Sequence, residues 1–388
     1  MSEPDRVFLY VNDIAYSGWT DISITRGIDR CVSSFHFSAT ERPDGPYVRP
    51  FDLCEIYVED DKYLTGYVES VTPHFDKGAH SIRISGHSRT KDLTDCNPDI
   101  QSGQFSGFTF AQIARAICGL FKIDVVIETD NANQVVQNTN LERSESGFKF
   151  LERLANLSGV LLTDDEEGRL VLTVAGDTRS PSRLVQGDNI LSGNAAYNVE
   201  KRFSNYIIKG QSGIGCGAAF NLDGDGGVSE EPPVGEIQTA MRAEAIDPDV
   251  PRYRPHVTLA ESQLTPAQMQ ERVNWQRQYA YGQSIKISVR TPNFRQSDGK
   301  LWRPNILVPL DAPWFFADDA ELLVAQVTLT LDANSSGHVA DLMLGPIEGY
   351  MPDPGKVKVK KAKHSGGGGG KKKSGGGGMD LSGIGGIP

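Results

Sequence analysis

The sequence predicts a mainly β protein with an α+β insertion and two related β-barrel-like domains. Three observations lead to this prediction. Short runs rich in β-branched and aromatic residues, bounded by turn residues, fill the chain up to about residue 95 and return from about residue 181. Helical patterns gather between these two regions. One stretch of the first β region is echoed near the end of the second.

Residues 1–95 are predicted to form the first β-barrel domain. The runs "VFLYV" and "CEIYVED" are typical of strands, because they are short and are bounded by Asn, Asp, Gly or Pro. Further on, two strand-like runs flank a polar turn at Asp76, Lys77 and Gly78. This pattern predicts a long hairpin.

Residues 96–180 are predicted to form a small α+β domain at the periphery. Thr109 precedes Gln112 by three residues, as in a capping box, and Gly159 is a C-terminal stop for a second helix. An acidic turn closing at Gly168 separates two apolar strands in "VLLTDDEEGRLVLTV". The predicted core-facing stripes are Ile113, Ile117, Leu120 and Phe121 in the first helix, and Phe148, Leu151, Leu154 and Leu157 in the second.

Residues 181–350 are predicted to form the second β-barrel domain, interrupted by a polar, glycine-rich loop and by one helix. Thr265 as N-cap, Pro266 at the first position and Gln268 predict where this helix begins, and Gly282 is predicted to lie just past its end. Its predicted core-facing side consists of Met269, Val273, Gln276 and Ala280, flanked by Trp275 and Tyr279.

The echo between the two β regions lies in their hairpins. One begins with "RPFDLCEIYVEDD" at residues 49–61, and the other with "RPNILVPLDAPWFFADD" at residues 303–319. Each continues into an apolar strand, a polar turn and a second apolar strand that ends at a glycine, Gly86 or Gly345. Two related barrels are the favoured interpretation, and a chance likeness between hairpins is the alternative.

The charge of the 388-residue chain is unevenly distributed. From Lys356 onward there are eight lysines and one acidic residue, Asp380, a net charge of +7. The preceding body holds 31 basic and 49 acidic residues, a net charge of −18. Such a body disfavours general nucleic-acid binding, because phosphate contacts need clustered lysine and arginine.

The cysteines and the apolar runs indicate the compartment. No run approaches the roughly 20 apolar residues that span a bilayer, and the N-terminus lacks a basic region followed by an apolar core. A cytoplasm-like compartment is therefore expected. The five scattered cysteines, never in a CxxC pair, are expected to be reduced, buried thiols: Cys31, Cys54, Cys96, Cys118 and Cys216.

Motifs for catalysis or ligand binding fail on their spacing. In "GQSGIG" Ile214 stands where a nucleophile elbow needs glycine, and "GIGCGAA" lacks the third glycine of a dinucleotide site. "NLDGDGGVSEEP" imitates a calcium loop, but Pro232 replaces the twelfth-position glutamate. The histidines show no metal-ligand spacing. No catalytic residue, cofactor or metal is predicted.

Several phrases, in order along the chain, resemble baseplate hub proteins of Mu-like contractile-tailed phages, in the late control protein D group. They are "VNDIAYSGW", "YLTGYVESVTP", "SGHSRTKDLTDC", "ESGFKFLERLANLSGVLLTDDEEGRLVLT", "RYRPHVTLAE" and "LWRPNILV". The resemblance covers roughly residues 5–350, and residues 351–388 lie outside it.

This resemblance implies a homotrimer in which two barrels per subunit build a pseudo-sixfold ring. The implied partners are the tail tube, the trimeric central spike and other baseplate proteins. The implied function is structural, a symmetry adaptor in the virion tail that is assembled in the host cytoplasm. The alternatives are a tail-tip cell-wall hydrolase, and a hub or spike component of a type VI secretion-like injection machine.

The C-terminal tail, residues 351–388, is the candidate partner-binding segment. Its Gly-rich linker, residues 365–378, has a root-mean-square reach of about 20 Å. The basic tail residues Lys371, Lys372 and Lys373 are expected to be attracted to acidic protein, either this body or a neighbour. The apolar tip consists of Met379, Leu381, Ile384 and Ile387, and we expect it to dock on the spike, the tube or the tape-measure protein. A solubilising tail and a leftover linker are the alternatives.

Overall fold

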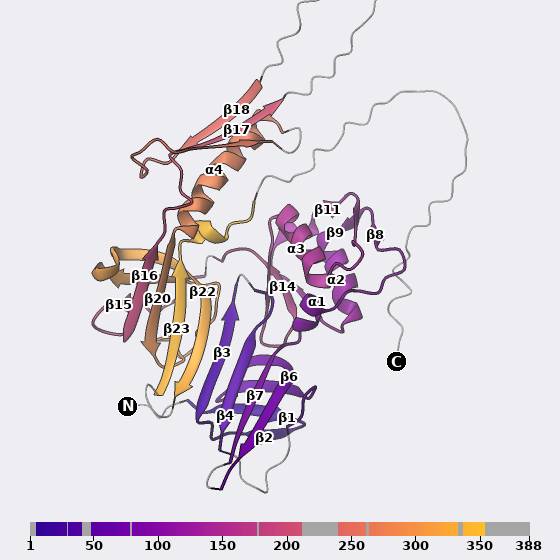
Figure 1. The fold of residues 1–388 in the computed structure, drawn as a ribbon, viewed down its shortest axis with the longest axis vertical. Helices are drawn as coiled ribbons and strands as arrows, with labels where there is room; N and C mark the ends of the chain where they lie inside the picture. The colour runs from indigo at the N-terminus through magenta and orange to yellow at the C-terminus, as the bar shows by residue number, and fades with distance from the viewer. Residues whose placement is uncertain are drawn as a thin grey trace, which may run out of the picture. The chain divides into compact units, whose positions relative to one another are not determined.

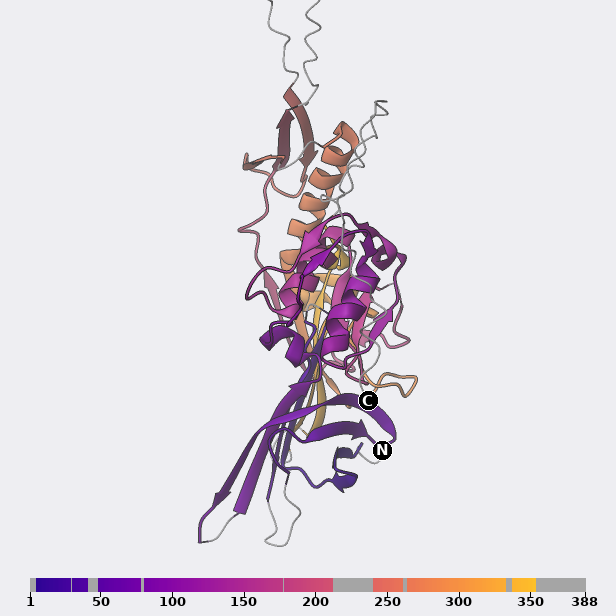
Figure 2. The same cartoon turned by 90° about the vertical axis from the view of Figure 1, so that its right-hand side faces the viewer.

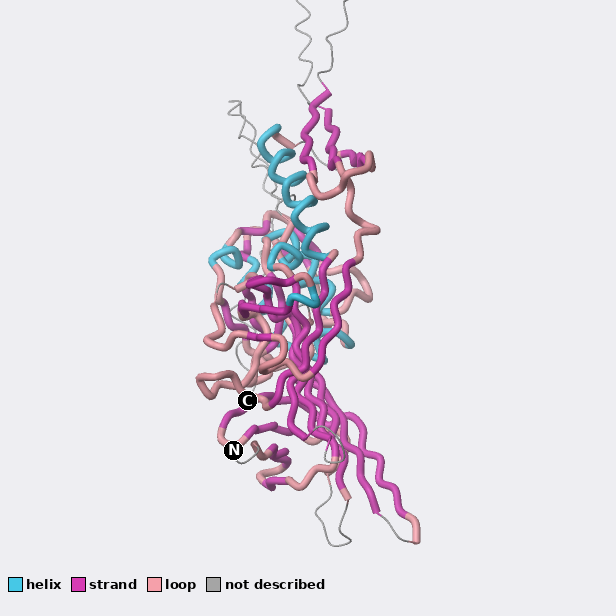
Figure 3. Tube along the Cα trace, turned by 90° about the vertical axis from the view of Figure 1, so that its left-hand side faces the viewer, coloured by secondary structure: helices cyan, strands magenta, loops and turns pink. Residues whose placement is uncertain are grey.

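The computed structural model describes residues 5–28, 30–40, 48–77, 80–176, 178–211, 240–260, 264–332 and 337–353. They belong to one compact unit, Met1–Val357. Strands make up most of the regular structure in this unit, and the helices are few (Figure 3). The mainly β fold with an α+β insertion is confirmed.

One 13-stranded sheet unites the two β regions in the described part of the chain. Its order is β16-β20-β23-β22-β3-β4-β7-β6-β5-β1-β2, with β21 beside β22 and β15 beside β21. The two regions meet where β3 pairs with β22, for example Ile24 opposite Leu329 (Figure 1). The strands are β1 (Val7–Val11), β2 (Ile14–Tyr16), β3 (Asp21–Gly27), β4 (Ser34–Ala39), β5 (Leu53–Val58), β6 (Asp61–Phe75), β7 (His80–Ser88), β15 (Leu184–Val185), β16 (Ser192–Tyr197), β20 (Ile285–Pro292), β21 (Leu307–Ala312), β22 (Ala317–Asp332) and β23 (Gly337–Gly345).

The echoed sequences form equivalent three-stranded units, β5-β6-β7 and β21-β22-β23. A register shift interrupts the β6–β7 ladder between Val68 and Ser70, and another interrupts the β22–β23 ladder between Val324 and Gln326. An extra residue at such a bulge bends the strand and increases its twist, as barrel curvature requires. The likeness between the two sequences therefore extends to their local geometry.

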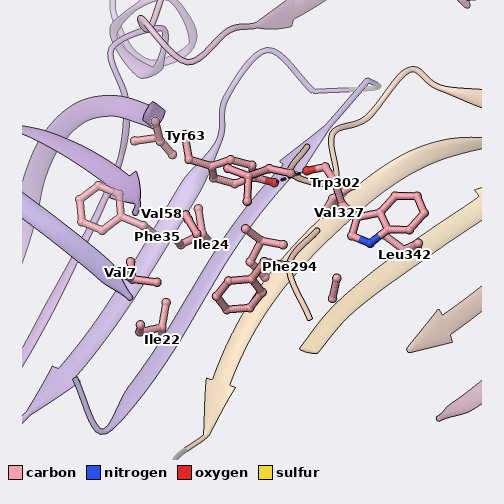
Figure 4. Packing of buried hydrophobic residues seen from close by; sticks show 14 of the residues in the cluster. Val7, Ile22, Ile24, Phe35, Val58, Tyr63, Phe294, Trp302, Val327 and Leu342 are labelled. Carbon is pink, nitrogen blue, oxygen red and sulfur yellow. Dashed lines mark hydrogen bonds between the residues drawn. The ribbon is translucent and has the colours of Figure 1, made fainter. Parts of the chain in front are cut away.

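The main hydrophobic core contains side chains from both β regions. Tyr63 and Trp302 are fully buried within it, and the Tyr63 hydroxyl donates a hydrogen bond of 3.0 Å to the Trp302 carbonyl (Figure 4). Closer to the surface, Arg295 pairs with Asp5 at 2.9 Å and with Asp61 at 2.6 Å. The two β regions are thus joined by packing, by strand pairing and by charge.

The α+β insertion forms a second core around two helices. Its elements are α1 (Lys91–Asp95), β8 (Gln104–Phe105), β9 (Phe108–Thr109), α2 (Phe110–Leu120), β10 (Val125–Ile127), η1 (Asp130–Asn133), β11 (Val135–Val136), β12 (Thr139–Asn140), α3 (Gly147–Ser158), β13 (Leu161–Asp164) and β14 (Leu170–Thr173). The predicted capping box of Thr109 and Gln112 is confirmed, and Gly159 ends α3 in the left-handed conformation at φ 68°.

The predicted helix stripes are only partly correct. Leu151 and Leu154 are buried as expected, but Leu120 is 42% exposed, and the fully buried Phe150 was not predicted to face the core. Because α2 ends at Leu120, that side chain lies at the end of the helix rather than in the middle of its buried face.

A buried charge links the insertion to the first β region. The Asp164 carboxylate accepts hydrogen bonds from the Ser33 amide at 3.0 Å and the Ser33 hydroxyl at 2.8 Å. Arg26 donates to the Asp164 carbonyl at 3.0 Å. Burial raises the pKa of the Asp164 carboxyl, although Arg26 and the hydrogen bonds act in the opposite direction.

A separate three-stranded sheet, absent from the prediction, forms a small unit with the long helix. Strands β17 (Asn205–Gln211), β18 (Ala240–Ile246) and β19 (Pro255–Leu259) form this sheet, and α4 (Pro266–Gln283) runs beside β17 and β18 (Figure 2). Met269 and Val273 of α4 pack against Tyr206 and Ile208. The predicted capping box at Thr265 is confirmed.

The predicted end of this helix is wrong, because Gly282 lies inside α4, which continues to Gln283. A Cβ at Gly282 would lie 2.0 Å from the amide nitrogen of Gly349, within the turn η3 (Ile347–Tyr350). Glycine is therefore needed here for close packing rather than for a helix cap.

Gly282→Ala is expected to lower the free energy of unfolding by about 1–3 kcal/mol, because the added methyl group forces α4 away from Gly349. Urea titration of the full chain measures the change. Gly119→Ala in α2 is the matched control, since its Cβ would meet nothing within 4 Å, and alanine stabilises a helix relative to glycine by about 0.5–1 kcal/mol. Equal losses in both variants would contradict the packing explanation.

Cys31, Cys54 and Cys118 are buried free thiols, as predicted, and burial raises the pKa of Cys54 and Cys118 to about 12. Cys96 is exposed, against expectation, because it caps the short helix α1 at its C-terminus. Cys216 lies outside the described residues.

Among the described helices, none has the length and apolarity needed to cross a bilayer.

Candidate assembly surface

Strand β16 ends the large sheet and leaves one side of its backbone unpaired within the described chain, because β20 is its neighbour on the other side. The Asn198 amide donates to the Ser284 carbonyl at 2.8 Å. Since bonding alternates along an antiparallel pair, the amides of Gly193, Ala195 and Tyr197 point away from β20. This row of donors and carbonyls is free to pair with another strand.

The edge also lacks the features that protect a free strand. The sequence of β16, "SGNAAY", contains no charge and no proline, and five of its six residues are exposed. Soluble proteins usually protect such an edge with lysine, proline, a bulge or a covering segment. The end of the sheet therefore has the properties of an interface strand.

Large exposed hydrophobic side chains flank this edge, and we call them the edge patch: Leu191, Tyr197, Trp314 and Phe316. Trp314 is 79% exposed and Phe316 is 87% exposed, on and just after the turn η2 (Pro313–Phe315). The Tyr197 hydroxyl donates to the Phe315 carbonyl, and the ring centroids of Tyr197 and Phe316 are 6.1 Å apart. The turn is thereby fixed against β16.

A hollow of about 330 Å³ lies beside the edge patch. Ile285, Ile287 and Leu322 give it an apolar lining, and Glu321 and Glu348 add carboxylates. Burial is the main cause that raises the pKa of the Tyr197 hydroxyl, and the nearby Tyr281 is the second. Because Arg179 already pairs with Glu321, at 2.8 Å, the surface is suited mainly to binding apolar groups.

One cluster in the described chain resembles a hydrolytic triad by residue type, but its geometry is wrong. The Ser38 hydroxyl lies 3.3 Å from His36 Nε2, and the Asp21 carboxylate lies 4.0 Å from the same nitrogen. In a working triad the acid orients the opposite ring nitrogen. Within the described ranges, no group of three His, Cys, Asp or Glu side chains could hold a metal ion.

The sequence-predicted site residues lie outside the described residues, so the structure does not test them. They comprise the tip Met379, Leu381, Ile384 and Ile387 and the basic residues Lys371, Lys372 and Lys373. Most of the glycine-rich stretch with the rejected motifs, residues 212–239, also lies outside them. Sequence reasoning missed the edge patch, although three successive aromatic residues after Pro313 were a visible signal.

Comparison with known proteins identifies the class of this β-rich fold as phage tail proteins. The structure matches the 43 kDa tail protein of prophage MuSo2 from Shewanella oneidensis at a TM-score of 0.76 and 28% identity, covering 89% of this chain and 99% of that one. It also matches an E. coli protein described as a component of the type VI secretion system, at a TM-score of 0.54 and 11% identity over 89% of this chain and 79% of that one. The second match shows a shared fold alone.

The sequence matches are more specific. Residues 6–88 match the model "Mu phage baseplate assembly protein GpP-like, N-terminal", residues 90–174 match "Baseplate hub protein gp44-like, second domain", and residues 265–353 match "Mu phage baseplate assembly protein GpP, fourth domain". The baseplate hub protein gp44 of Escherichia phage Mu is 29% identical over 340 residues, 87% of this chain and 86% of that protein. The chain belongs to the Mu-like family of phage tail baseplate hub proteins.

Proposed function

We propose that this baseplate hub protein forms a closed homotrimer that joins the tail tube to the central spike and contacts other baseplate proteins. The observation that supports it best is the unpaired β16 edge beside the edge patch. A cyclic ring covers such a surface in every subunit at once, because each copy places the same edge against its neighbour.

We propose further that the hub acts without catalytic turnover, in the virion tail, after assembly in the host cytoplasm. Matching threefold to sixfold symmetry requires shape and strong interfaces rather than a nucleophile or a metal. Residues 1–95 and 181–350 would supply the ring, residues 96–180 its periphery, and residues 351–388 an attached tail. Clearing of a peptidoglycan suspension by the pure protein, abolished by one point substitution, would contradict this.

The double variant with Trp314→Ser and Phe316→Asn is expected to weaken subunit association by at least about tenfold. Both side chains are almost fully exposed in one subunit, so the variant loses no core packing. Phe316 has φ 54°, in the left-handed region that asparagine adopts more readily than phenylalanine, so the free subunit should be no less stable. Light scattering at micromolar concentration measures the mass of the wild type and the variant.

Tyr253→Ser is the matched control, since Tyr253 is an 83% exposed aromatic residue outside the edge patch. The control should keep the trimeric mass. A wild-type monomer would contradict the trimer, and a double variant that remains trimeric would exclude the edge patch as its interface.

We propose that the tail tip is a partner-binding segment that tethers a tail component, namely the spike, the tube or the tape-measure protein, to the ring. Its support is the sequence alone, four apolar residues at the end of a basic, glycine-rich linker. Deleting residues 365–388 is expected to leave the trimer intact and to reduce the yield and stability of assembled tails. Truncated hubs that assemble tails of normal yield, stability and infectivity would contradict this role.

A further inference from the structure

A groove of about 560 Å³ lies on the face of β16 opposite the edge patch. Side chains alternate between the two faces of a strand, so Ala196 and Asn198 line the groove while Tyr197 lines the hollow beside the edge patch. Trp275 and Tyr279 of α4 contribute the facing wall. The large sheet and the small three-stranded unit both contribute to this groove.

The aromatic rings of the groove are held in place by their neighbours. Phe203 stacks on His256 with centroids 4.6 Å apart, and the Arg254 guanidinium lies 5.4 Å from the Phe203 centroid. Trp275 stacks on Tyr279 at 5.0 Å. The rings therefore form a fixed apolar lining, and their edges carry a partial positive charge that suits carbonyl and carboxylate oxygens.

Two lysine side chains at the groove have no acidic partner within the described chain. Lys201 and Lys286 are exposed at the groove and form no ion pair with any described residue. Two ammonium groups without an acidic partner, on a body of net charge −18, form a local site for an anion.

We propose that this groove binds a peptide segment of another tail protein in which aliphatic side chains adjoin a carboxylate. An aliphatic side chain fills the space between the ring pairs, and the adjoining carboxylate lies near Lys201 and Lys286. The proposed hub function enters only in naming the partner as a tail protein. The recognition chemistry does not depend on the trimer.

The probe is a fluorescein-labelled, end-blocked Leu-Asp-Leu peptide, followed by fluorescence polarisation with the full chain. We expect saturable binding that weakens as salt rises, and no binding of the Leu-Lys-Leu counterpart. Lys201→Glu combined with Lys286→Glu should weaken binding at least about tenfold. Lys209→Glu is the matched control, because Lys209 is exposed on β17 and does not line the groove, and it should bind as the wild type.

Several results would overturn the proposal. They are no saturable binding up to about 1 mM, equal binding by the Lys201→Glu, Lys286→Glu variant, and displacement of the probe by chitotriose. If the probe binds only to a chain truncated after Val357, the occupant of the groove in the full chain is the chain's own tail. If the probe binds only to the Trp314→Ser, Phe316→Asn variant, in which subunit association is weakened, the occupant of the groove in the wild type is a second copy of the chain. Light scattering reports the trimer separately, so failure of the groove and failure of the hub model are distinguishable.

Discussion

Replacing Arg202 with methionine is expected to lower the free energy of unfolding of the three-stranded unit by about 3–5 kcal/mol. The Arg202 guanidinium binds Asp247 at 2.8 to 3.0 Å and Asp249 at 2.9 Å, and it lies 5.2 Å from the Tyr281 ring centroid. Asp247 is 4% exposed. Methionine would leave its carboxylate buried without a counter-charge, which costs far more than the ion pair itself contributes.

Hydrogen exchange of the β17 and β18 amides in the full chain measures this loss locally. The double variant with Arg202→Met and Asp247→Leu is the matched control, because it leaves no unpaired charge in the same space. It should recover most of the stability. A single variant within about 1 kcal/mol of the wild type would mean that water reaches the pair in solution.

Local features of the chain could be predicted because their causes lie within a few residues. The capping boxes at Thr109 and Thr265 need one side chain and an amide three residues further on. The end of α3 at Gly159 depends only on the left-handed φ of that glycine. Gly282 shows the limit of this reasoning. A glycine is needed at this position because of its contact with Gly349, which is distant in sequence and close in space.

The arrangement of the sheet depends on contacts that the sequence does not display. Strand β3 pairs with β22, about three hundred residues later, and nothing in either run specifies that partner. The unpaired edge of β16 is harder still to predict, because an end strand is defined by the neighbour that it lacks. The same holds for burial: Phe316 is 87% exposed, while Phe315 next to it packs against the main core.

The candidate site also has a part that the sequence could reveal and parts that it could not. The edge patch combines segments more than a hundred residues apart, such as Tyr197 with Phe316, and the groove combines segments up to 90 residues apart, so local spacing could not show that their parts meet. The tail tip was found because its apolar residues and glycines lie close together in one short stretch of sequence. Its role in binding a partner stays a prediction.

Replacing Trp302 with alanine is expected to lower the free energy of unfolding by about 3–5 kcal/mol. The indole is 2% exposed in the core shared by the two β regions, where its removal leaves a cavity that surrounding strands cannot close. Urea titration of the full chain gives the difference. The Tyr63 hydroxyl keeps its hydrogen bond in every variant, because the acceptor is the backbone carbonyl of residue 302.

Trp302→Phe separates packing from polarity at the same position. The Trp302 indole nitrogen is buried and has no hydrogen-bond partner within the described chain, so it imposes a desolvation cost of about 1–3 kcal/mol. Phenylalanine removes that nitrogen, keeps an aromatic ring and leaves a smaller cavity than alanine. The two effects oppose each other, and the variant should lie within about 1 kcal/mol of the wild type. If phenylalanine costs clearly more than about 1 kcal/mol, removing the indole nitrogen brings no gain, which means that this nitrogen is hydrated in solution and that the joint between the two β regions contains a water site.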